Sequence, residues 1–386
     1  MKRKAGYYIT QKITGESFRA YVPSPLPLNQ FHPSLDWEVL FPLFEKATAK
    51  LAELKSLQQH IPNPNLFLYS YVRKEALLSS QIEGTQSSFS DLILFEHDQK
   101  TTVSLEDVEE VSHYVKALSY AIERIQAGFP LSLRLLREIH HILLQGSRGK
   151  EKESGEFRRS QNWIGGTRPG NALFVPPPPE ELPRLLGNLE IFLHESNLPP
   201  LLKAGIAHLQ LETLHPFLDG NGRLGRLLIS LLLTVEGTLE EPILYLSLYL
   251  KEHRSLYYQL LQEVRTNGDW EKWLTFFLEG VIYSAQDGIS TIEKMEQLFK
   301  NDQAIITTLG RARFSCQEAW EYMKQLPQIT APLLAKGLSI TPPTARVVLM
   351  KLEKVGILEE ISGKKRDKIY IYRDYLTLLE KGTEPL

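Results

Sequence analysis

Helical periodicity is the feature that most limits what this chain can fold into. From Leu35 to about Phe299, apolar residues recur three and four positions apart, which is the spacing of one face of an α-helix. The pattern predicts helices that begin near residues 36, 66, 105, 131, 180, 200, 223, 250 and 269. At 386 residues the chain is too long for one compact core, so two or three domains are expected. The fold class is therefore predicted to be mainly α.

Two segments depart from this pattern. Between Gly155 and Pro179, turn-forming residues surround short extended pieces, which predicts a β-hairpin or flap. After residue 301, two short helices near 327–336 and 342–355 are followed by two strand-like stretches with a basic turn between them. Helix, turn, helix and hairpin is the layout of a winged helix. We therefore expect an N-terminal helical region at 1–100, a core at 101–300 and a winged-helix domain at 301–386.

Composition excludes several classes of protein. The hydrophobic (42%) and charged (23%) fractions are those of a globular protein, and the net charge of −2 argues against a strongly basic nucleic-acid binder. A single cysteine, Cys316, cannot form an internal disulfide and fits a reducing compartment. The most apolar stretch, 227–235, is far shorter than the roughly 20 residues of a membrane span. With no apolar segment resembling a signal peptide near residue 7, a cytoplasmic protein without membrane contact is expected.

A polar island from His215 to Arg226 separates the two most apolar predicted helices. Gly220 and Gly222 allow a ligand to approach the backbone, whose N–H groups continue into the positive end of the following helix. Arg223 and Arg226 are three residues apart, so they are expected to project from one face of its first turn. Two guanidinium groups beside a helix N-terminus suit a polyphosphate.

Two further residues of the island bring reactive chemistry. Asp219 is a hard oxygen ligand placed to hold Mg²⁺ against the same phosphates. His215 is the residue of the island that takes up a proton near neutral pH. Each has a structural explanation by itself: a histidine at a helix end, a tight Gly-Asn-Gly loop, arginines facing solvent. Gathered between two buried helices, they predict a ligand site.

The island matches the signature of the Fic family, His-x-Phe-x-(Asp/Glu)-Gly-Asn-Gly-Arg-x-x-Arg, at every specified position. The chain therefore resembles a Fic-type protein adenylyltransferase, which moves AMP from ATP to a Ser, Thr or Tyr hydroxyl of a target protein or of itself. The resemblance implies that His215 is the general base and Asp219 the Mg²⁺ ligand. It also implies a set of residues that bind the phosphates of ATP: Gly220, Asn221, Gly222, Arg223, Gly225 and Arg226. Catalysis would come mainly from positioning and charge neutralisation while pyrophosphate leaves.

A second motif precedes the island. Ser79, Glu83 and Gly84 fill the fixed positions of a motif similar to the inhibitory (Ser/Thr)-x-x-x-Glu-(Gly/Asn) of Fic proteins. Serine and glutamate four apart before a glycine would otherwise indicate only a helix end. Beside the signature, the resemblance implies that Glu83 pairs with Arg226 in the place of the γ-phosphate. ATP would then bind with its α-phosphate poorly aimed for attack.

The resemblance extends to the target and to the base of the nucleotide. In Fic enzymes an extended target segment pairs with a flap, and Ile164, Gly165 and Gly166 resemble that element. Tyr257 and Tyr258 resemble a pair that flanks adenine, although helical aromatics fit a hydrophobic core equally well. The proposed winged helix makes the whole chain similar to bacterial SoFic-type enzymes.

Two rival functions remain open at this stage. Residues 330–386 contain ten Lys and Arg against seven Asp and Glu, and so small an excess gives little support for DNA contact. Contact with protein, including a homodimer, is an equal alternative for the winged helix. One rival is a DNA-binding regulator whose Fic core senses nucleotide. The other is a Fic enzyme that removes AMP from its target.

Overall fold

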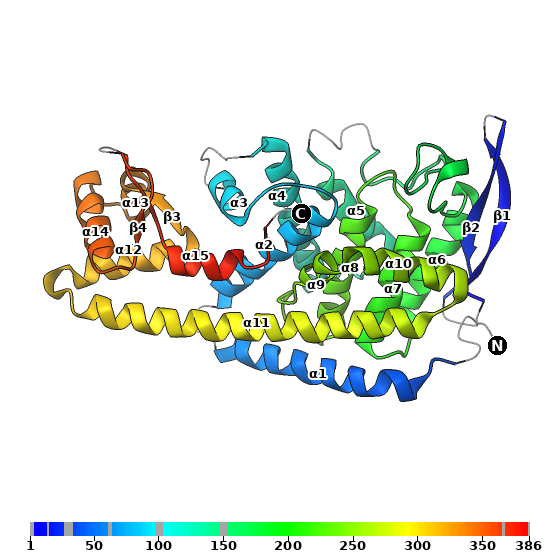
Figure 1. Cartoon of the computed structure of the whole chain (residues 1–386), viewed down its shortest axis with the longest axis horizontal. Helices are drawn as coiled ribbons and strands as arrows, with labels where there is room; N and C mark the ends of the chain where they lie inside the picture. The colour runs from blue at the N-terminus through cyan, green and yellow to red at the C-terminus, as the bar shows by residue number, and fades with distance from the viewer. Residues whose placement is uncertain are drawn as a thin grey trace.

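The computed structural model describes residues 4–13, 15–26, 34–60, 64–96, 103–146, 153–364 and 367–384. It is mainly helical, as predicted (Figure 1). Its α-helices are α1 (Trp37–His60), α2 (Pro64–Ile82), α3 (Phe89–Glu96), α4 (Leu105–Gln126), α5 (Leu133–Leu143), α6 (Leu182–Glu195), α7 (Pro200–Leu214), α8 (Asn221–Val235), α9 (Ser247–Glu252), α10 (Arg254–Asn267), α11 (Trp270–Thr307), α12 (Arg313–Gln325), α13 (Ala331–Leu338), α14 (Pro342–Lys354) and α15 (Arg373–Glu380). Short 3₁₀ turns are η1 (Pro169–Asn171), η2 (Pro179–Glu181) and η3 (Gly310–Ala312).

Helices α7 and α8 form the centre of the molecule. Every residue of α7 from Leu201 to Leu214 is buried, and α8 is buried from Arg223 to Leu233. A helix that is buried all round needs no single apolar stripe, and the apolar residues of α7 accordingly lie on every side of it. The two helices pack on each other and are surrounded by α4, α5, α6, α10 and α11. The polar island therefore lies at the turn between the two most enclosed helices of the fold.

The longest helix, α11, joins the core to the C-terminal unit. It has 38 residues, and α1 packs along it, as Figure 1 shows. The domain boundary expected at residue 301 falls inside this helix, which continues to Thr307. The backbone thus passes without a break from the core into the unit that follows.

The C-terminal unit contains α12, α13 and α14 beside a small antiparallel sheet. Strands β3 (Gln328–Thr330), β4 (Glu359–Glu360) and β5 (Ile369–Ile371) lie in the order β3-β5-β4. The first predicted helix begins at residue 331 rather than 327, because residues 328–330 pair with β5 instead. These are the elements expected of a winged helix, and that assignment remains a prediction.

The sheets elsewhere differ from the sequence prediction. An unexpected antiparallel hairpin lies near the N-terminus, where β1 (Gly6–Ile13) pairs with β2 (Glu16–Pro23). The hairpin expected between residues 155 and 179 is reduced to one β-bridge, Ile164 with Phe174. Prolines at 169 and 176–179 lack the N–H that a ladder needs, so the strands cannot extend. Within the described residues, no helix is long and apolar enough to cross a membrane.

Candidate active site

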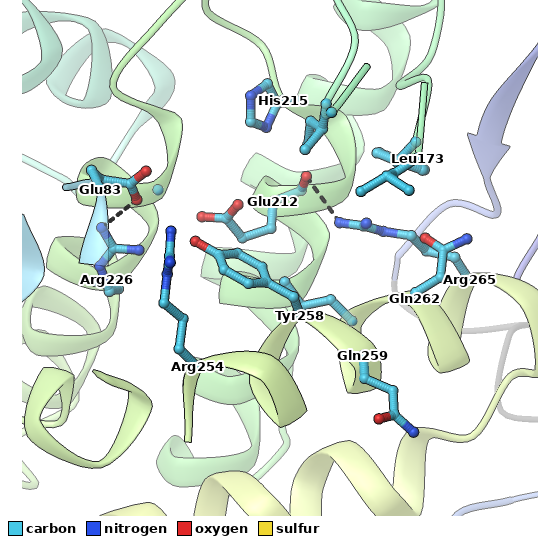
Figure 2. Close-up of a pocket in the computed structure, with 15 residues that line it drawn as sticks. Glu83, Leu173, Glu212, His215, Arg226, Arg254, Tyr258, Gln259, Gln262 and Arg265 are labelled. Carbon is cyan, nitrogen blue, oxygen red and sulfur yellow. Dashed lines mark hydrogen bonds and ion pairs between the residues drawn. The ribbon is translucent and has the colours of Figure 1, made fainter. Parts of the chain in front are cut away.

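The polar island opens onto a cavity of about 560 Å³, a size that holds a small ligand (Figure 2). Its wall combines two acids and three arginines from four separate segments with apolar residues of the flap. The lining residues are Glu83, Ile164, Gly165, Leu173, Phe174, Glu212, His215, Gly222, Arg226, Arg254, Tyr258, Gln259, Leu261, Gln262 and Arg265. The cavity therefore brings together Glu83 and the island, which are far apart in the sequence.

His215 is held at the end of α7 by its backbone. It caps the helix in the left-handed conformation (φ 45°), with its N–H bonded to Leu211 O at 2.9 Å. Its carbonyl accepts hydrogen bonds from Arg158 Nε at 2.9 Å and from Asn162 Nδ2 at 3.2 Å. The segment that leads to the flap thus fixes His215, a role that its sequence did not indicate.

The His215 ring is neutral at physiological pH. Burial first, and then the positive charges of Arg265 and Arg158, together lower its pKa to about 3. Its Nδ1 is buried and has no hydrogen-bond partner among the described residues. A neutral imidazole that lines the cavity with an unused nitrogen can accept a proton.

The side chain of Asn221 shapes the loop instead of facing the cavity. Its Oδ1 accepts from Phe217 N–H and its Nδ2 donates to Phe217 O, both at 2.9 Å. Both polar atoms of this side chain thus bond across the loop in the described structure, and its contact with phosphates stays a prediction. The ring of Phe217 stacks on the ring of His140, with their centroids 3.7 Å apart. His140 Nδ1 accepts from Gly155 N–H, so its Nε2 carries the proton and donates to Asp219 O at 2.9 Å.

Helix α8 begins beside this loop with little space around its first turn. Gly220 is its N-cap, and a Cβ on Gly222 would lie 2.2 Å from Glu83 Oε1 and 3.0 Å from Arg226 Nη1. Only glycine therefore fits at 222. The first N–H groups of a helix lack intrahelical acceptors and attract anions. Here the Glu83 carboxylate lies close to Gly222 in this first turn.

Arg226 is bound to α2 by three hydrogen bonds. Its Nη2 donates to Glu83 Oε1 at 2.6 Å and to Ser79 O at 2.9 Å, while its Nε donates to Ser79 Oγ at 2.8 Å. Serine and glutamate four residues apart lie on one face of a helix, so both reach the same guanidinium. The predicted pairing of Glu83 with Arg226 is thus present (Figure 2).

Charge strengthens this contact. Burial would raise the pKa of Glu83, but the Arg226 charge and hydrogen bond outweigh it, so the pKa lies below its ordinary value. Burial likewise disfavours the charged form of Arg226, whereas Glu83 raises the Arg226 pKa above its ordinary value. The pair is ionised at neutral pH.

Gly84 ends α2 directly after Glu83. Its N–H bonds to Gln81 O at 3.0 Å, and Thr85 N–H bonds to Ser80 O at 3.3 Å, with φ of Gly84 at +106°. These two bonds and a left-handed glycine form a Schellman cap. The glycine of the motif therefore sets where the helix stops, and with it the position of Glu83.

Arg223 does not line the cavity. Its Nη1 pairs with Glu110 Oε1 of α4 at 2.7 Å, and its Nη2 lies 3.9 Å from Asp219 Oδ1. The expectation that both arginines face one polyphosphate is not met here, because each is bound by an acid from a different helix. Gly225 is also enclosed, since a Cβ there would lie 2.7 Å from Glu212 Oε1.

The residues present fit a Mg²⁺ ion that is bound mainly by phosphates. Asp219 is half-exposed, with 47% of its side chain accessible beside the start of α8. Among the described residues, no group of three or more metal-ligating side chains gathers. Mg²⁺ commonly uses one or two carboxylates with substrate phosphates, so Asp219 would hold it in that way.

The two tyrosines of α10 have different surroundings. Tyr257 is fully buried and its hydroxyl is 2.9 Å from His208 Nε2, so it belongs to the core and does not line the cavity. Tyr258 is 39% exposed and does line it. Of the pair expected beside adenine, only Tyr258 is accessible to a ligand.

The flap covers one side of the cavity. Ile164 N–H bonds to Phe174 O at 2.8 Å, and Leu173 is 82% exposed. Ile164 and Gly165 line the cavity, whereas Gly166 lies in the turn beyond it. Tyr21 of β2 donates its N–H to Val175 O at 2.9 Å, so the N-terminal hairpin supports the flap.

Sequence reasoning missed Glu212 and Arg265. Glu212 precedes His215 by one helical turn, and burial raises its pKa to about 7. Arg265 Nη2 donates to Glu212 O at 3.2 Å and Arg265 Nε to Thr213 Oγ1 at 3.0 Å. Helical spacing could have found both residues, because residues three or seven positions from a site residue lie on the same face of a helix. Glu212 stands three before His215, and Arg265 seven after Tyr258.

Comparison with known proteins agrees with this geometry. The model described as Fic/DOC family N-terminal matches residues 41–123, and the Fic/DOC family model matches residues 130–233. The chain is 32% identical over 179 residues to the protein adenylyltransferase Fic of Drosophila virilis, and 31% identical to that of Drosophila melanogaster. These matches cover 46% of this chain but only 34% and 33% of the relatives, so it spans about a third of their length.

Solved structures show the same fold. A Fic family protein from Desulfovibrio desulfuricans G20 superposes with a TM-score of 0.58 at 19% identity, covering 88% of this chain and 97% of that one. A fragment of Fic-1 from C. elegans gives 0.51 at 21% identity, covering 69% and 75%. The two matched segments, on both sides of the α4–α5 connection, are thus similar to proteins of the Fic/DOC family, and the whole chain shares the fold of solved Fic proteins.

Proposed function

We propose that this chain is a protein adenylyltransferase that transfers AMP from ATP to a Ser, Thr or Tyr hydroxyl of a target protein. The observation that carries the proposal is one cavity that joins a neutral His215 to the backbone of Gly222 and to Arg226. These supply a proton acceptor, an anion-binding helix start and a fixed positive charge. The relatives from Drosophila are named protein adenylyltransferases, which supports the same activity.

The chemistry assigns a role to each residue. The phosphates lie against the start of α8, beside Arg226, and the nucleotide base extends towards Tyr258. The target hydroxyl gives its proton to His215 while its oxygen forms a bond to the α-phosphorus. The bond from the α-phosphorus to the bridging oxygen breaks, and pyrophosphate leaves. Mg²⁺, when held by Asp219, neutralises phosphate charge.

The described conformation is an inhibited one in this proposal. The Glu83 carboxylate lies 2.6 Å from Arg226 Nη2 and close to Gly222, where a phosphate would otherwise be. An anion competes poorly with a carboxylate already paired to a buried guanidinium. ATP therefore reaches a productive position only after Glu83 has moved away.

The transferred group tests this function. We expect the Glu83→Gly protein to label itself with α-labelled ATP and Mg²⁺ but not with γ-labelled ATP, because AMP is transferred and pyrophosphate leaves. Glu83→Gly/His215→Ala should stay unlabelled with either nucleotide, since it lacks the proton acceptor. Gel autoradiography after equal incubation measures both.

Other outcomes would point to other functions. Labelling from γ-labelled ATP would mean phosphate transfer and contradict the proposal. Wild-type protein that stays unlabelled but removes label from an AMP-modified protein would favour the AMP-removing enzyme. A shift of DNA at physiological salt, without any nucleotide transfer, would favour the regulator.

A further inference from the structure

The side of α2 that faces away from the cavity is covered by residues 382–384. Gln81 lies two residues from both Ser79 and Glu83, and residues two apart on a helix point to opposite sides. Its side chain is fully buried, and its Nε2 donates to Thr383 O at 2.7 Å and to Ser87 O at 3.0 Å. The helix that carries Glu83 on one side therefore holds a peptide segment on the other.

Lys251 of α9 completes this contact. Its ammonium group is almost buried and donates to Gln81 Oε1 at 2.8 Å and to Gly382 O at 3.2 Å, and also to Glu384 O. Three consecutive carbonyls, at 382, 383 and 384, are thus bound by donors from α2 and α9. Because all three contacts are to main-chain carbonyls, this is a site for a peptide backbone, here filled by the protein's own segment.

Helix α15 anchors that segment. Ser90 Oγ of α3 donates to a Glu380 carboxylate oxygen, and Lys381 pairs with Asp287 of α11. Thr383 is 3% exposed. Figure 1 shows α15 running from the C-terminal unit towards α2. The C-terminal unit is thereby connected to the helix that bears Glu83.

We propose that residues 382–384 form a latch that occupies a peptide-binding site on α2 and α9 and holds Glu83 against Arg226. The inference rests on the proposed function and adds its regulation. Gln81 links the two sides, because its side chain binds the latch and its carbonyl accepts from Gly84 N–H in the cap of α2. Withdrawal of the latch removes these partners from the Lys251 ammonium and the Gln81 amide and opens this side of α2 to water, which favours rearrangement of the last turn of α2. A protein that binds the C-terminal unit and draws α15 away would activate the enzyme.

Gly382→Ala tests the latch without changing α2, α9 or the cavity. Gly382 has φ +78°, and a Cβ there would lie 2.6 Å from Leu248 Cδ1, so alanine is strained in the docked position. A left-handed alanine shifts an equilibrium by roughly 5- to 30-fold. We expect AMP transfer by Gly382→Ala to rise at least about fivefold, within that range. Hydrogen exchange of the amides at 79–85 should become faster in the same variant.

Gly363→Ala is the matched control. Gly363 also has a positive φ (+61°), but nothing lies within 4 Å of its Cβ position, and it is in the turn between β4 and β5. We expect unchanged transfer and unchanged exchange at 79–85. Gly382→Ala/Glu83→Gly should be no faster than Glu83→Gly, because both changes release the same contact.

Two results separate this inference from the function on which it rests. If Glu83→Gly is activated while Gly382→Ala matches the wild type in both transfer and exchange, the latch is wrong and the proposed function stands. If Glu83→Gly transfers no AMP, the proposed function itself fails. Lys251→Met removes the donor to the carbonyls of 382 and 384 and should therefore raise AMP transfer as Gly382→Ala does. If neither variant transfers AMP faster than the wild type, the latch is also overturned.

Discussion

The carboxyl group of Glu212 lies in the wall of the cavity, where it loses contact with water and gains few hydrogen bonds in return. It is 5% exposed, and its Oε1 has no hydrogen-bond partner among the described residues. Burial raises its pKa to about 7, and Arg226 opposes this shift only in part. Near neutral pH the folded protein therefore holds a carboxyl that is partly protonated beside His215.

Replacement of Glu212 by glutamine should stabilise the protein at alkaline pH. The folded pKa of about 7 lies above the ordinary 4.5, so the protonated group contributes stability that is complete below pH 4.5 and is lost as pH rises through 7. Glutamine has the same shape without the ionisation. We expect the free energy of unfolding in urea to rise by about 1–3 kcal/mol at pH 8 and to change little at pH 4.5.

Glu318→Gln provides the comparison, because Glu318 is exposed on α12. Its free energy of unfolding should match the wild type at both pH values. A Glu212→Gln protein that is less stable than the wild type at pH 8 would mean that the carboxylate is stabilised by its arginine neighbours, contrary to this account.

The sequence alone predicted a contact correctly where both of its residues belong to the two motifs. The ion pair of Glu83 with Arg226 was predicted and is present, because the two motifs specify both ends of it. Asn221 and Arg223 were expected at the phosphates, and Tyr257 either beside adenine or in the core. In the structure each of these side chains is bound within the protein. Their partners, at 217, 110 and 208, lie on other elements or across a turn, where local spacing gives no indication.

At the scale of elements, the end of α2 decides where Glu83 lies. Gly84 adopts φ +106°, and nothing lies within 4 Å of the position that a Cβ would take. Alanine there is therefore disfavoured by backbone conformation alone and not by a clash. The same cap occurs on α14, where Gly356 N–H bonds to Glu353 O and Ile357 N–H to Leu352 O, both at 3.0 Å.

Gly84→Ala should weaken the inhibitory contact as well as the fold. We expect it to lower the free energy of unfolding by about 1–2 kcal/mol, the cost of a left-handed alanine, and to raise AMP transfer severalfold because Glu83 loses its fixed position. Gly356→Ala has the same cap and the same open surroundings on α14, so it should be destabilised similarly with no gain in transfer. Thermal unfolding and a transfer assay measure the two effects, and equal activation of both variants would contradict the role given to Gly84.

The flap shows what element prediction could not give. Turn chemistry between residues 155 and 179 correctly indicated a non-helical segment, but not that one bridge is all the pairing it forms. Its stability comes from outside, through Tyr21 N–H to Val175 O. The hairpin that provides this contact was itself missed. Pairing between Tyr21 and Val175, 154 residues apart in the chain, depends on the packed structure and not on either segment alone.

At the scale of the molecule, periodicity was enough to give the helical class and the central pair α7 and α8. It could not reveal that α11 runs through the expected boundary at 301. An amphipathic helix has the same apolar pattern whether it packs on one unit or on two. The contact of residues 382–384 with α2 also joins distant parts of the chain. These long-range contacts connect the C-terminal unit with the helix that leads to Glu83.

The rate of AMP transfer in three proteins tests most directly whether the Glu83–Arg226 pair holds an intact enzyme inactive. We predict that Glu83→Gly transfers AMP from α-labelled ATP at least about tenfold faster than the wild type, which corresponds to a contact of about 1.4 kcal/mol. Glu83→Gln, which keeps the shape but loses the charge, should be intermediate. If all three proteins bind ATP and transfer AMP at the same rate, the central claim is contradicted.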